Sequence, residues 1–174
     1  MHSDFNMHCQ CIFYEVGQRG LFSHPFLMRL SLFSDYSLRV LMYAALSEGP
    51  FRLDEVTDAY GVSRNHLAKV IPVLSQLGFL ETRRGRRGGI ELARAAGEIR
   101  LGQVIRQTEA QEGLAECFDA ETSTCRIAGC CRLKGALVAA LKAFYETLDE
   151  YTLEDLVKGR HRASMKRILL GAER

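Results

Sequence analysis

Residues 53–76 read LDEVTDAYGVSRNHLAKVIPVLSQ, and this stretch decides the fold. Leu53, Val56 and Tyr60 recur at helical spacing, and Gly61 ends that helix. Ser63 can cap a second helix, because a serine oxygen accepts a hydrogen bond from a free N–H group of the first turn. The apolar stripe of this second helix comprises Leu67, Val70, Ile71, Leu74 and Leu77. Two helices joined by a three-residue turn that contains glycine form a helix-turn-helix.

The flanking segments predict a winged form of this motif. Gly78 closes the second helix, residues 79–82 are expected to form a strand, and residues 90–92 its partner in a short hairpin. Upstream, Ser34 is the expected N-cap of a first helix that ends at Gly49-Pro50, with Asp35 in its first turn. The apolar face of that helix is expected to contain Leu38, Leu41, Met42, Ala45 and Leu46. We therefore predict a mainly α fold, with a winged helix-turn-helix over residues 28–100.

Basic and polar side chains gather on the two parts of such a motif that touch DNA. Residues 61–90 carry six basic side chains against Glu81 alone. A helix fits the major groove, where its first turn reads base edges, and a basic loop contacts phosphates or the minor groove. The alternative to DNA binding is a small helical domain that binds protein. Separately, Pro72 lies inside the second helix of the motif, where a proline predicts a kink. The expected DNA-binding residues are Ser63, Arg64, Asn65, His66, Lys69, Arg83, Arg84, Arg86 and Arg87.

The remainder of the chain is expected to divide into four parts. Residues 1–27 have no sustained periodicity and predict a poorly ordered extension, which makes Met28 a candidate start. Residues 101–131 contain a short helix to about Glu109 and then a polar, cysteine-rich loop. Residues 132–157 are expected to be a dimerisation helix, because the apolar stripe from Arg132 to Tyr151 has little else in this segment to cover it as the core of a separate domain. Residues 158–174 form a basic tail, for which contact with DNA phosphates is one alternative and a solvated, mobile tail is the expectation.

Composition and charge restrict the class of protein. The 174 residues are 47% hydrophobic and carry a net charge of +2, which describes an ordinary globular chain. That average hides a basic block at 61–90, an acidic block at 101–156 and a second basic block over the last 18 residues. No apolar run is long enough to cross a bilayer, and no signal peptide precedes the six cysteines. These features predict a cytoplasmic protein with no membrane partner.

Four of the six cysteines lie within 15 residues: Cys117, Cys125, Cys130 and Cys131. Clustered thiolates on an adaptable loop suit a soft metal or an iron–sulfur cluster. A structural zinc site usually shows paired Cys-x2-Cys units, which are absent here. A reversible disulfide switch is the other alternative. An enzyme is not supported, because the sequence has no recognisable nucleophile with a base, no paired carboxylates and no phosphate-binding glycine motif.

Several motifs together resemble one family over most of the chain. They are FSDYSLR at 33–39, YGVSRNH at 60–66, RRGRRGGI at 83–90, CRLK at 131–134 and DEYTLEDLV at 149–157. They resemble the NsrR branch of the winged-helix iron–sulfur regulators that also include IscR and RirA. The resemblance implies a homodimeric, nitric-oxide-sensing repressor that binds DNA while its cluster is intact. It also implies an inverted-repeat operator, expected to be AT-rich, and control of nitric-oxide detoxification genes such as that of a flavohaemoglobin.

Matching this family residue by residue implies a ligand set. The three cysteine ligands fall on Cys117, Cys125 and Cys131, the last because the family ligand directly precedes the Arg-Leu-Lys run. The fourth ligand resembles Asp35, donated by the partner subunit, although from the residues alone Asp35 is a first-turn carboxylate that pairs with Arg39. The implied cofactor is a [4Fe-4S] cluster, with [2Fe-2S] as a degraded or alternative form.

Two related functions remain open at this point. The chain can be a regulator that reports iron–sulfur status, or a thiol redox regulator in which Cys117, Cys125, Cys130 or Cys131 form disulfides. Cys130 has no role in the implied ligand set, and it can substitute for Cys131 or be a bystander. Iron content after anaerobic purification separates the cluster and disulfide alternatives.

Overall fold

The computed structural model of the protein describes residues 29–83, 85, 88–109, 115–119 and 121–171. The elements within those residues are α1 (Leu32–Leu46), α2 (Leu53–Tyr60), α3 (Arg64–Gln76), β1 (Leu80–Arg83), β2 (Gly89–Leu92), η1 (Ala96–Glu98), α4 (Leu101–Thr108), η2 (Glu116–Phe118), α5 (Arg132–Asp149), α6 (Leu153–Val157), η3 (Gly159–His161) and α7 (Arg162–Leu170). The predicted fold class is confirmed: the chain is mainly helical with one two-stranded antiparallel hairpin.

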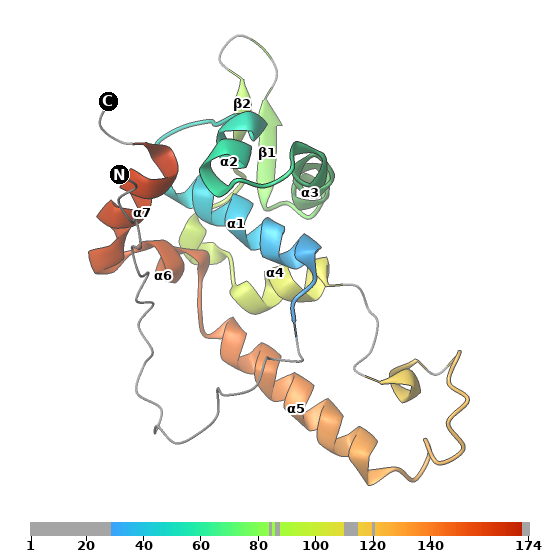
Figure 1. Cartoon of the computed structure of the whole chain (residues 1–174). Coiled ribbons are helices and arrows are strands. Elements are labelled where there is room, and N and C mark those ends of the chain that lie inside the picture. The colour runs from blue at the N-terminus through green and yellow to red at the C-terminus, as the bar shows by residue number, and fades with distance from the viewer. Residues whose placement is uncertain (1–28, 84, 86–87, 110–114, 120, 172–174) are drawn as a thin grey trace, which may run out of the picture.

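Helix α1 is the centre of the molecule. It crosses the middle of the domain in Figure 1, and it packs against α3, α4, α6 and α7. Its buried residues include Val40, Leu41 and Leu46, which are 0% exposed. Ridges of side chains from the surrounding helices bury this face, and such burial of apolar surface is the main stabilising contribution to a fold.

The start of α1 differs from the sequence prediction. Ser31, not Ser34, is the N-cap, and its hydroxyl oxygen accepts the Ser34 N–H at 3.1 Å. Ser34 lies in the first turn, is fully buried, and shares a 2.8 Å hydroxyl hydrogen bond with Thr108 of α4. Three serines near the helix start made the choice of cap ambiguous, and the buried bond to α4 decides it.

The predicted helix-turn-helix is confirmed, with α2 and α3 at the expected bounds. Gly61 ends α2 with a left-handed φ of 61°, which a glycine adopts without strain. Ser63 is at the N-cap position of α3, although its side chain makes no capping bond there. Pro72 lies inside α3, and the helix continues to Gln76 because Ile71 and Leu74 on either side of it are buried in the core.

The wing is an antiparallel hairpin in which Leu80 pairs with Leu92 and Arg83 with Gly89. Phe51 adds an isolated bridge to Ile90, with backbone hydrogen bonds of 2.9 and 2.8 Å. This bridge brings the loop before α2 so close that a Cβ at Gly89 would meet the Pro50 side chain at 2.8 Å. The hairpin is thereby fixed beside α2 and α3, as Figure 1 shows.

Helix α5 extends away from the rest of the molecule (Figure 1). None of its 18 residues is buried, and it packs mainly against α4. The sequence prediction of one helix over residues 132–157 is wrong at its C-terminal end, because α5 ends at Asp149 and Thr152 caps a separate α6. Thr152 and Asp155 form a capping box there, and Leu153 and Val157 of α6 are buried in the core.

The C-terminal segment also differs from expectation. The predicted mobile tail is wrong for residues 162–170, which form α7 and pack against α1 and α2. Lys166 pairs with Glu48 at 2.6 Å, and Leu169 and Leu170 pack on the core. The predicted extension over residues 1–27 lies outside the described residues. Among the helices of the described ranges, none is long and apolar enough to span a membrane.

Candidate nucleic-acid interface and cysteine loop

The first turns of α3 present a polar, exposed surface. Arg64, Asn65, His66 and Lys69 are all exposed, whereas Leu67 and Val70 on the opposite side are buried. The 3.6-residue period therefore divides α3 into a core face and a free face. A helix whose N-terminal residues face outward in this way can enter a major groove and reach base edges with those side chains.

Arg64 has a local partner that does not prevent it from contacting DNA. Its Nε donates to Asp54 of α2 at 2.6 Å, and both side chains are 65% exposed. An exposed ion pair contributes little to stability, about 0–1 kcal/mol, because water and salt screen it. A phosphate can therefore replace Asp54 as the partner of this guanidinium at small cost.

The wing supplies one described arginine to the candidate interface. Arg83 is 63% exposed and pairs with Glu81 at 2.6 Å and with Glu91 at 2.8 Å. Its charge is therefore partly balanced by carboxylates on the same hairpin. Arg84, Arg86 and Arg87, which were predicted to bind DNA, lie outside the described residues, so their contribution stays a prediction.

A cluster of side chains between α1 and α3 was not predicted from the sequence. The Tyr36 ring stacks on the His66 ring, with centroids 5.6 Å apart and an interplanar angle of 30°. The guanidinium carbon of Arg39 lies 5.9 Å from the Tyr36 centroid and 5.8 Å from the Tyr60 centroid. Tyr36 and Arg39 are three residues apart on α1, which gave a weak signal that both face the same neighbour.

Asp35 is held by Arg39, as the four-residue spacing predicted. Arg39 Nε donates to Oδ1 at 3.1 Å, and a terminal nitrogen contacts Oδ2 at 2.8 Å. The Asp35 side chain remains 38% exposed, so a ligand can still approach it. Burial raises the pKa of the neighbouring Tyr60 to about 12, and the charge of Arg39 opposes that rise. Tyr60 therefore stays protonated at any physiological pH.

The cysteine loop carries four free thiols at the outer end of α5, well away from α1 in Figure 1. Cys117 belongs to η2 and is half-buried, Cys131 is the N-cap residue of α5 and is half-buried, and Cys125 and Cys130 are exposed. In the described part of this loop the structure does not gather three metal-ligating side chains at one point. The ligand set Cys117, Cys125 and Cys131 therefore remains a prediction.

Two carboxylates of the loop, Glu116 and Asp119, are occupied by its own turns. Glu116 accepts hydrogen bonds from the Thr124 N–H at 2.5 Å and from the Thr124 hydroxyl at 2.8 Å, and these bonds lower the pKa of Glu116. Asp119 accepts from the Thr122 hydroxyl and the Glu121 N–H, which likewise lower its pKa. Among the described residues, the thiols of Cys117, Cys125 and Cys131 make no hydrogen bond, and sulfur ligands suit a soft iron–sulfur group better than a hard cation.

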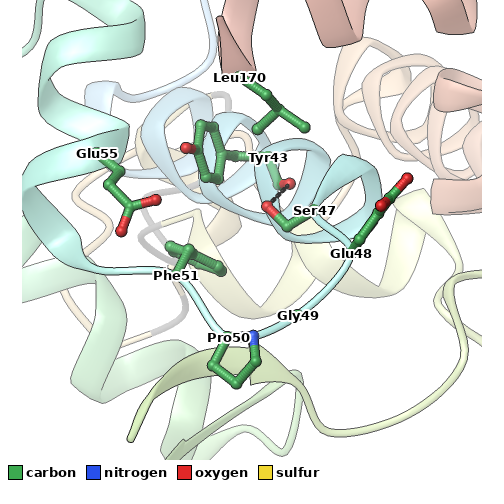
Figure 2. Close-up of a pocket in the computed structure, with 8 residues that line it drawn as sticks. All are labelled: Tyr43, Ser47, Glu48, Gly49, Pro50, Phe51, Glu55 and Leu170. Atoms are coloured by element: carbon green, nitrogen blue, oxygen red, sulfur yellow. Dashed lines mark hydrogen bonds between the residues drawn. The ribbon is translucent and has the colours of Figure 1, made fainter. Parts of the chain in front are cut away.

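A surface pocket of about 230 Å³ lies where the end of α1 meets α2 and α7. Figure 2 shows Tyr43 between Glu55 and Leu170, with the Ser47 hydroxyl donating to the Tyr43 carbonyl oxygen at 2.9 Å. Burial and the nearby Glu55 raise the pKa of Tyr43. Two of its polar side chains already have partners, because Glu48 pairs with Lys166 and Ser47 bonds to the α1 backbone. The pocket therefore lies at the packing boundary between α7 and the rest of the domain. It belongs to neither candidate site.

A family model and several known proteins that resemble this chain point to the same family of regulators. The Rrf2 family model, described as an iron-dependent transcriptional regulator, matches residues 30–159. The HTH-type transcriptional regulator NsrR of Bacillus subtilis is 46% identical over 136 residues, which cover 76% of this chain and 92% of that protein. The protein of the same name from Shouchella clausii is 47% identical over 132 residues, covering 75% of this chain and 89% of that one. Protein aau3 of Rhizobium meliloti is 44% identical over 147 residues, covering 84% and 94%.

Solved structures agree with the fold. The structure of T. potens IscR superposes with a TM-score of 0.63 and 26% identity, covering 79% of this chain and 91% of that chain. CymR of B. subtilis, the global cysteine regulator, superposes with a TM-score of 0.59 over 75% of this chain and 96% of that chain. At 24% identity, the CymR similarity supports the fold alone.

Proposed function

Because the chain belongs to the Rrf2 family of DNA-binding transcriptional regulators, we propose that it is a homodimeric repressor that senses nitric oxide through an iron–sulfur cluster. As a member of this family it is a regulator and not an enzyme. The observation that supports cluster-based nitric-oxide sensing is that an α3 with an exposed polar face occurs together with four free thiols in one loop. Relatives named NsrR, 42–47% identical, support the same assignment.

DNA recognition is assigned to α3 and the wing. Arg64, Asn65, His66 and Lys69 face outward from one end of α3, so this helix reads bases while Arg83, Arg84, Arg86 and Arg87 contact the backbone. Ser63, at the helix start, can present its backbone N–H to a phosphate. The expected ligand is double-stranded DNA with an AT-rich inverted repeat.

The dimer is assigned to α5. Leu133 is 65% exposed and Val138 is 47% exposed on a helix that has no buried residue. Apolar residues at 133, 137, 141, 144 and 148 form one stripe that a second copy can cover. A twofold dimer places two α3 helices against two half-sites, which matches an inverted repeat.

The cluster site is assigned to the thiolates of Cys117, Cys125 and Cys131 and to Asp35 of the partner subunit. A [4Fe-4S] cluster is the proposed form, with [2Fe-2S] as a degraded or alternative form. When bound, it supplies iron that reacts with nitric oxide, which is how the signal is received. A carboxylate oxygen holds soft iron less tightly than sulfur does, so Asp35 is the weakest member of this set.

The chain's own residues convert occupancy of this site into a change of DNA affinity. A loop of one subunit joined to α1 of the other constrains how the two α3 helices are spaced. Release of Asp35 returns its carboxylate to Arg39 alone and removes that constraint. A thousandfold loss of DNA affinity requires a difference of only about 4 kcal/mol between the two arrangements.

A second candidate function rests on the exposure of the thiols. Cys125 and Cys130 are exposed, and Cys130 adjoins Cys131, so oxidation can convert these thiols to disulfides without any metal. In this alternative the chain is a thiol redox regulator of the same fold. A regulator that reports iron–sulfur status is a further variant of the cluster-based proposal.

One anaerobic experiment tests the cluster and its ligands together. Wild type and Asp35→Ala are purified without oxygen, and their visible absorbance and iron content are measured. We expect a coloured wild type with about four iron atoms per chain, as a [4Fe-4S] cluster requires, and reduced cluster retention in Asp35→Ala. Iron-free wild type with disulfides in its peptide map would contradict the proposal and support the thiol redox alternative.

A further inference from the structure

Five side chains connect the first helix to both sides of the helix-turn-helix turn. They are Asp35, Tyr36 and Arg39 of α1, Tyr60 at the end of α2, and His66 in the first turns of α3. We propose that Arg39 and Tyr36 are positioning residues that transmit the bonding state of the Asp35 carboxylate to His66 on the DNA-reading helix. This inference rests on the proposed function and names the residues of its coupling route.

The route begins at a carboxylate with two competing partners. Arg39 uses two nitrogens to hold both oxygens of Asp35, at 3.1 and 2.8 Å. A ligand that takes either oxygen therefore competes with Arg39 for the carboxylate and removes one of these two contacts. Because the guanidinium is planar and its donors have a fixed fork geometry, it must reorient when one of the two bonds is lost.

Arg39 is held elsewhere only by aromatic faces among the residues that the structure describes. Its guanidinium lies within 5.9 Å of the Tyr36 and Tyr60 ring centroids, which is the range of cation–π attraction. A reoriented guanidinium therefore changes its interaction with both rings at once. Tyr60 is the last residue of α2, directly before the turn at Gly61.

The Tyr36 ring couples the orientation of the Arg39 guanidinium to α3, because it also stacks on His66. Its centroid lies 5.6 Å from that of His66, and stacking at this distance fixes the relative orientation of the two rings. His66 is exposed at the end of α3 that faces DNA, so its orientation decides which base edge or phosphate it meets. Tyr36 therefore acts on α3 through His66.

The placement of these contacts explains why a small movement matters. Tyr60 precedes the turn 61–63 and His66 follows it, so Arg39 and Tyr36 contact the motif on both sides of this turn. Within one protomer, the Asp35 presented to the partner's cluster is thus joined to that protomer's own reading helix. Linkage then requires the reverse effect, in which DNA bound at His66 changes the affinity of Asp35 for its ligand.

The connection can be tested without any cluster. The ring resonances of His66 are recorded by NMR on the full-length, metal-free protein, assigned with His66→Gln, and compared with those of Asp35→Asn. We expect Asp35→Asn to shift the His66 resonances. The matched control is Asp58→Asn, because Asp58 is exposed on α2 and has no ion pair with any residue that the structure describes. Identical His66 resonances in wild type and Asp35→Asn would overturn the proposal.

The consequence for DNA binding is measured on the cluster-loaded protein. The probe is a fluorescein-labelled duplex that the protein itself selects from a random-sequence pool, and its Kd is measured before and after nitric oxide. We expect Tyr36→Leu to keep the wild-type iron content and absorbance but to reduce the ratio of the two Kd values about tenfold, equivalent to about 1.4 kcal/mol of coupling. Tyr36→Phe keeps the ring and should keep the ratio.

A wild-type ratio in Tyr36→Leu would overturn the proposed route even if the protein senses nitric oxide. A wild type whose Kd does not respond to nitric oxide would instead contradict the proposed function. The NMR comparison decides the Asp35-to-His66 connection in either case. The two failures are therefore distinguishable.

Discussion

Cys131 belongs both to the cysteine loop and to the start of α5. It is the N-cap residue of α5, so its backbone is fixed by the helix, and its thiol is half-buried. Cys130 directly before it is exposed and points its Sγ toward the Ile127 carbonyl oxygen at 3.6 Å. Two adjacent cysteines thus have different surroundings, and only Cys131 is placed by a regular element.

This difference gives a prediction for cluster retention. Cys131→Ala is expected to lose most of its iron after anaerobic purification, because the cluster loses a ligand that α5 holds in place. The measurement is iron per chain together with visible absorbance. Cys130→Ala is the matched control and should retain the wild-type values, and the reverse result would move the ligand from Cys131 to Cys130.

At the scale of elements, the junction of α4 and α5 is unusually close. Arg106 of α4 holds both carboxylate oxygens of Asp149, and it lies 4.7 Å from the Tyr145 ring centroid. Arg100 donates to the Asp149 carbonyl oxygen at 3.3 Å. Gly102 permits this approach, because a Cβ there would lie 2.8 Å from the Asp149 Cγ and 2.9 Å from the Tyr145 carbonyl oxygen. The junction sets the direction in which α5 leaves the domain.

Gly102→Ala is therefore expected to destabilise the protein. A methyl group at this position must displace backbone as well as a side chain, which typically costs about 1–3 kcal/mol. Urea unfolding followed by circular dichroism measures the free energy of unfolding. Gly135→Ala is the control, since its Cβ meets nothing within 4 Å, and it should be neutral or stabilising by up to about 1 kcal/mol. Equal effects of the two substitutions would show that close packing at α4 is unimportant.

The same junction predicts a pH dependence. The hydrogen bond from Arg106 holds the pKa of Asp149 below its ordinary value of 3.8 in the folded protein. A carboxylate with a lowered folded pKa contributes stability above its unfolded pKa, about 3.9, and that contribution is lost as the pH falls through the folded value.

The difference in unfolding free energy between wild type and Asp149→Asn should therefore narrow from pH 5 to pH 3. Glu150→Gln serves as the control, because Glu150 is exposed and has no ion pair within the described ranges. A difference that stays constant over this pH range would contradict a role for the ionised Asp149.

The elements that the sequence predicts well are those with local signals. Gly61 and Gly78 mark the ends of α2 and α3, and apolar residues recur at helical spacing throughout α3 between them. These two helices and the hairpin that follows were therefore predicted correctly. The separate α6 was missed, because the apolar stripe runs on to Tyr151 and no glycine or proline in residues 149–152 marks the end of α5. Only the burial of Leu153 and Val157 in the core distinguishes α6. The stacking of Tyr36 on His66 joins residues far apart in the chain, and no local pattern indicates it.

At the scale of the whole molecule, the central feature is an exposed helix on a well-packed domain. The core around α1 buries Val40, Leu41 and Leu74 fully, whereas α5 has no buried residue. Leu133 of the apolar stripe is exposed and the stripe residues at 137, 141, 144 and 148 are only half-buried, and an uncovered apolar stripe on a long helix usually marks an interface. The proposed homodimer covers this face and brings Asp35 of the partner subunit toward the cysteine loop, which α5 carries at its outer end.

Leu137→Glu should therefore dissociate the dimer. Leu137 belongs to the apolar stripe, and a carboxylate there would be buried without a partner in the interface. Sedimentation velocity is expected to show a monomer, with much weaker binding to the inverted repeat. Ala139→Glu makes the same charge change on the opposite side of α5 and should leave a dimer. A dimeric Leu137→Glu would place the interface elsewhere.

The central claim is that an intact cluster holds the DNA-binding arrangement, and one titration tests it most directly. Anaerobically purified wild type is bound to its selected duplex, nitric oxide is added stepwise, and fluorescence anisotropy reports the bound fraction. We predict that a few equivalents of nitric oxide per cluster release the DNA, with a loss of affinity approaching a thousandfold. A complex that remains intact after the cluster absorbance has been lost would contradict the account.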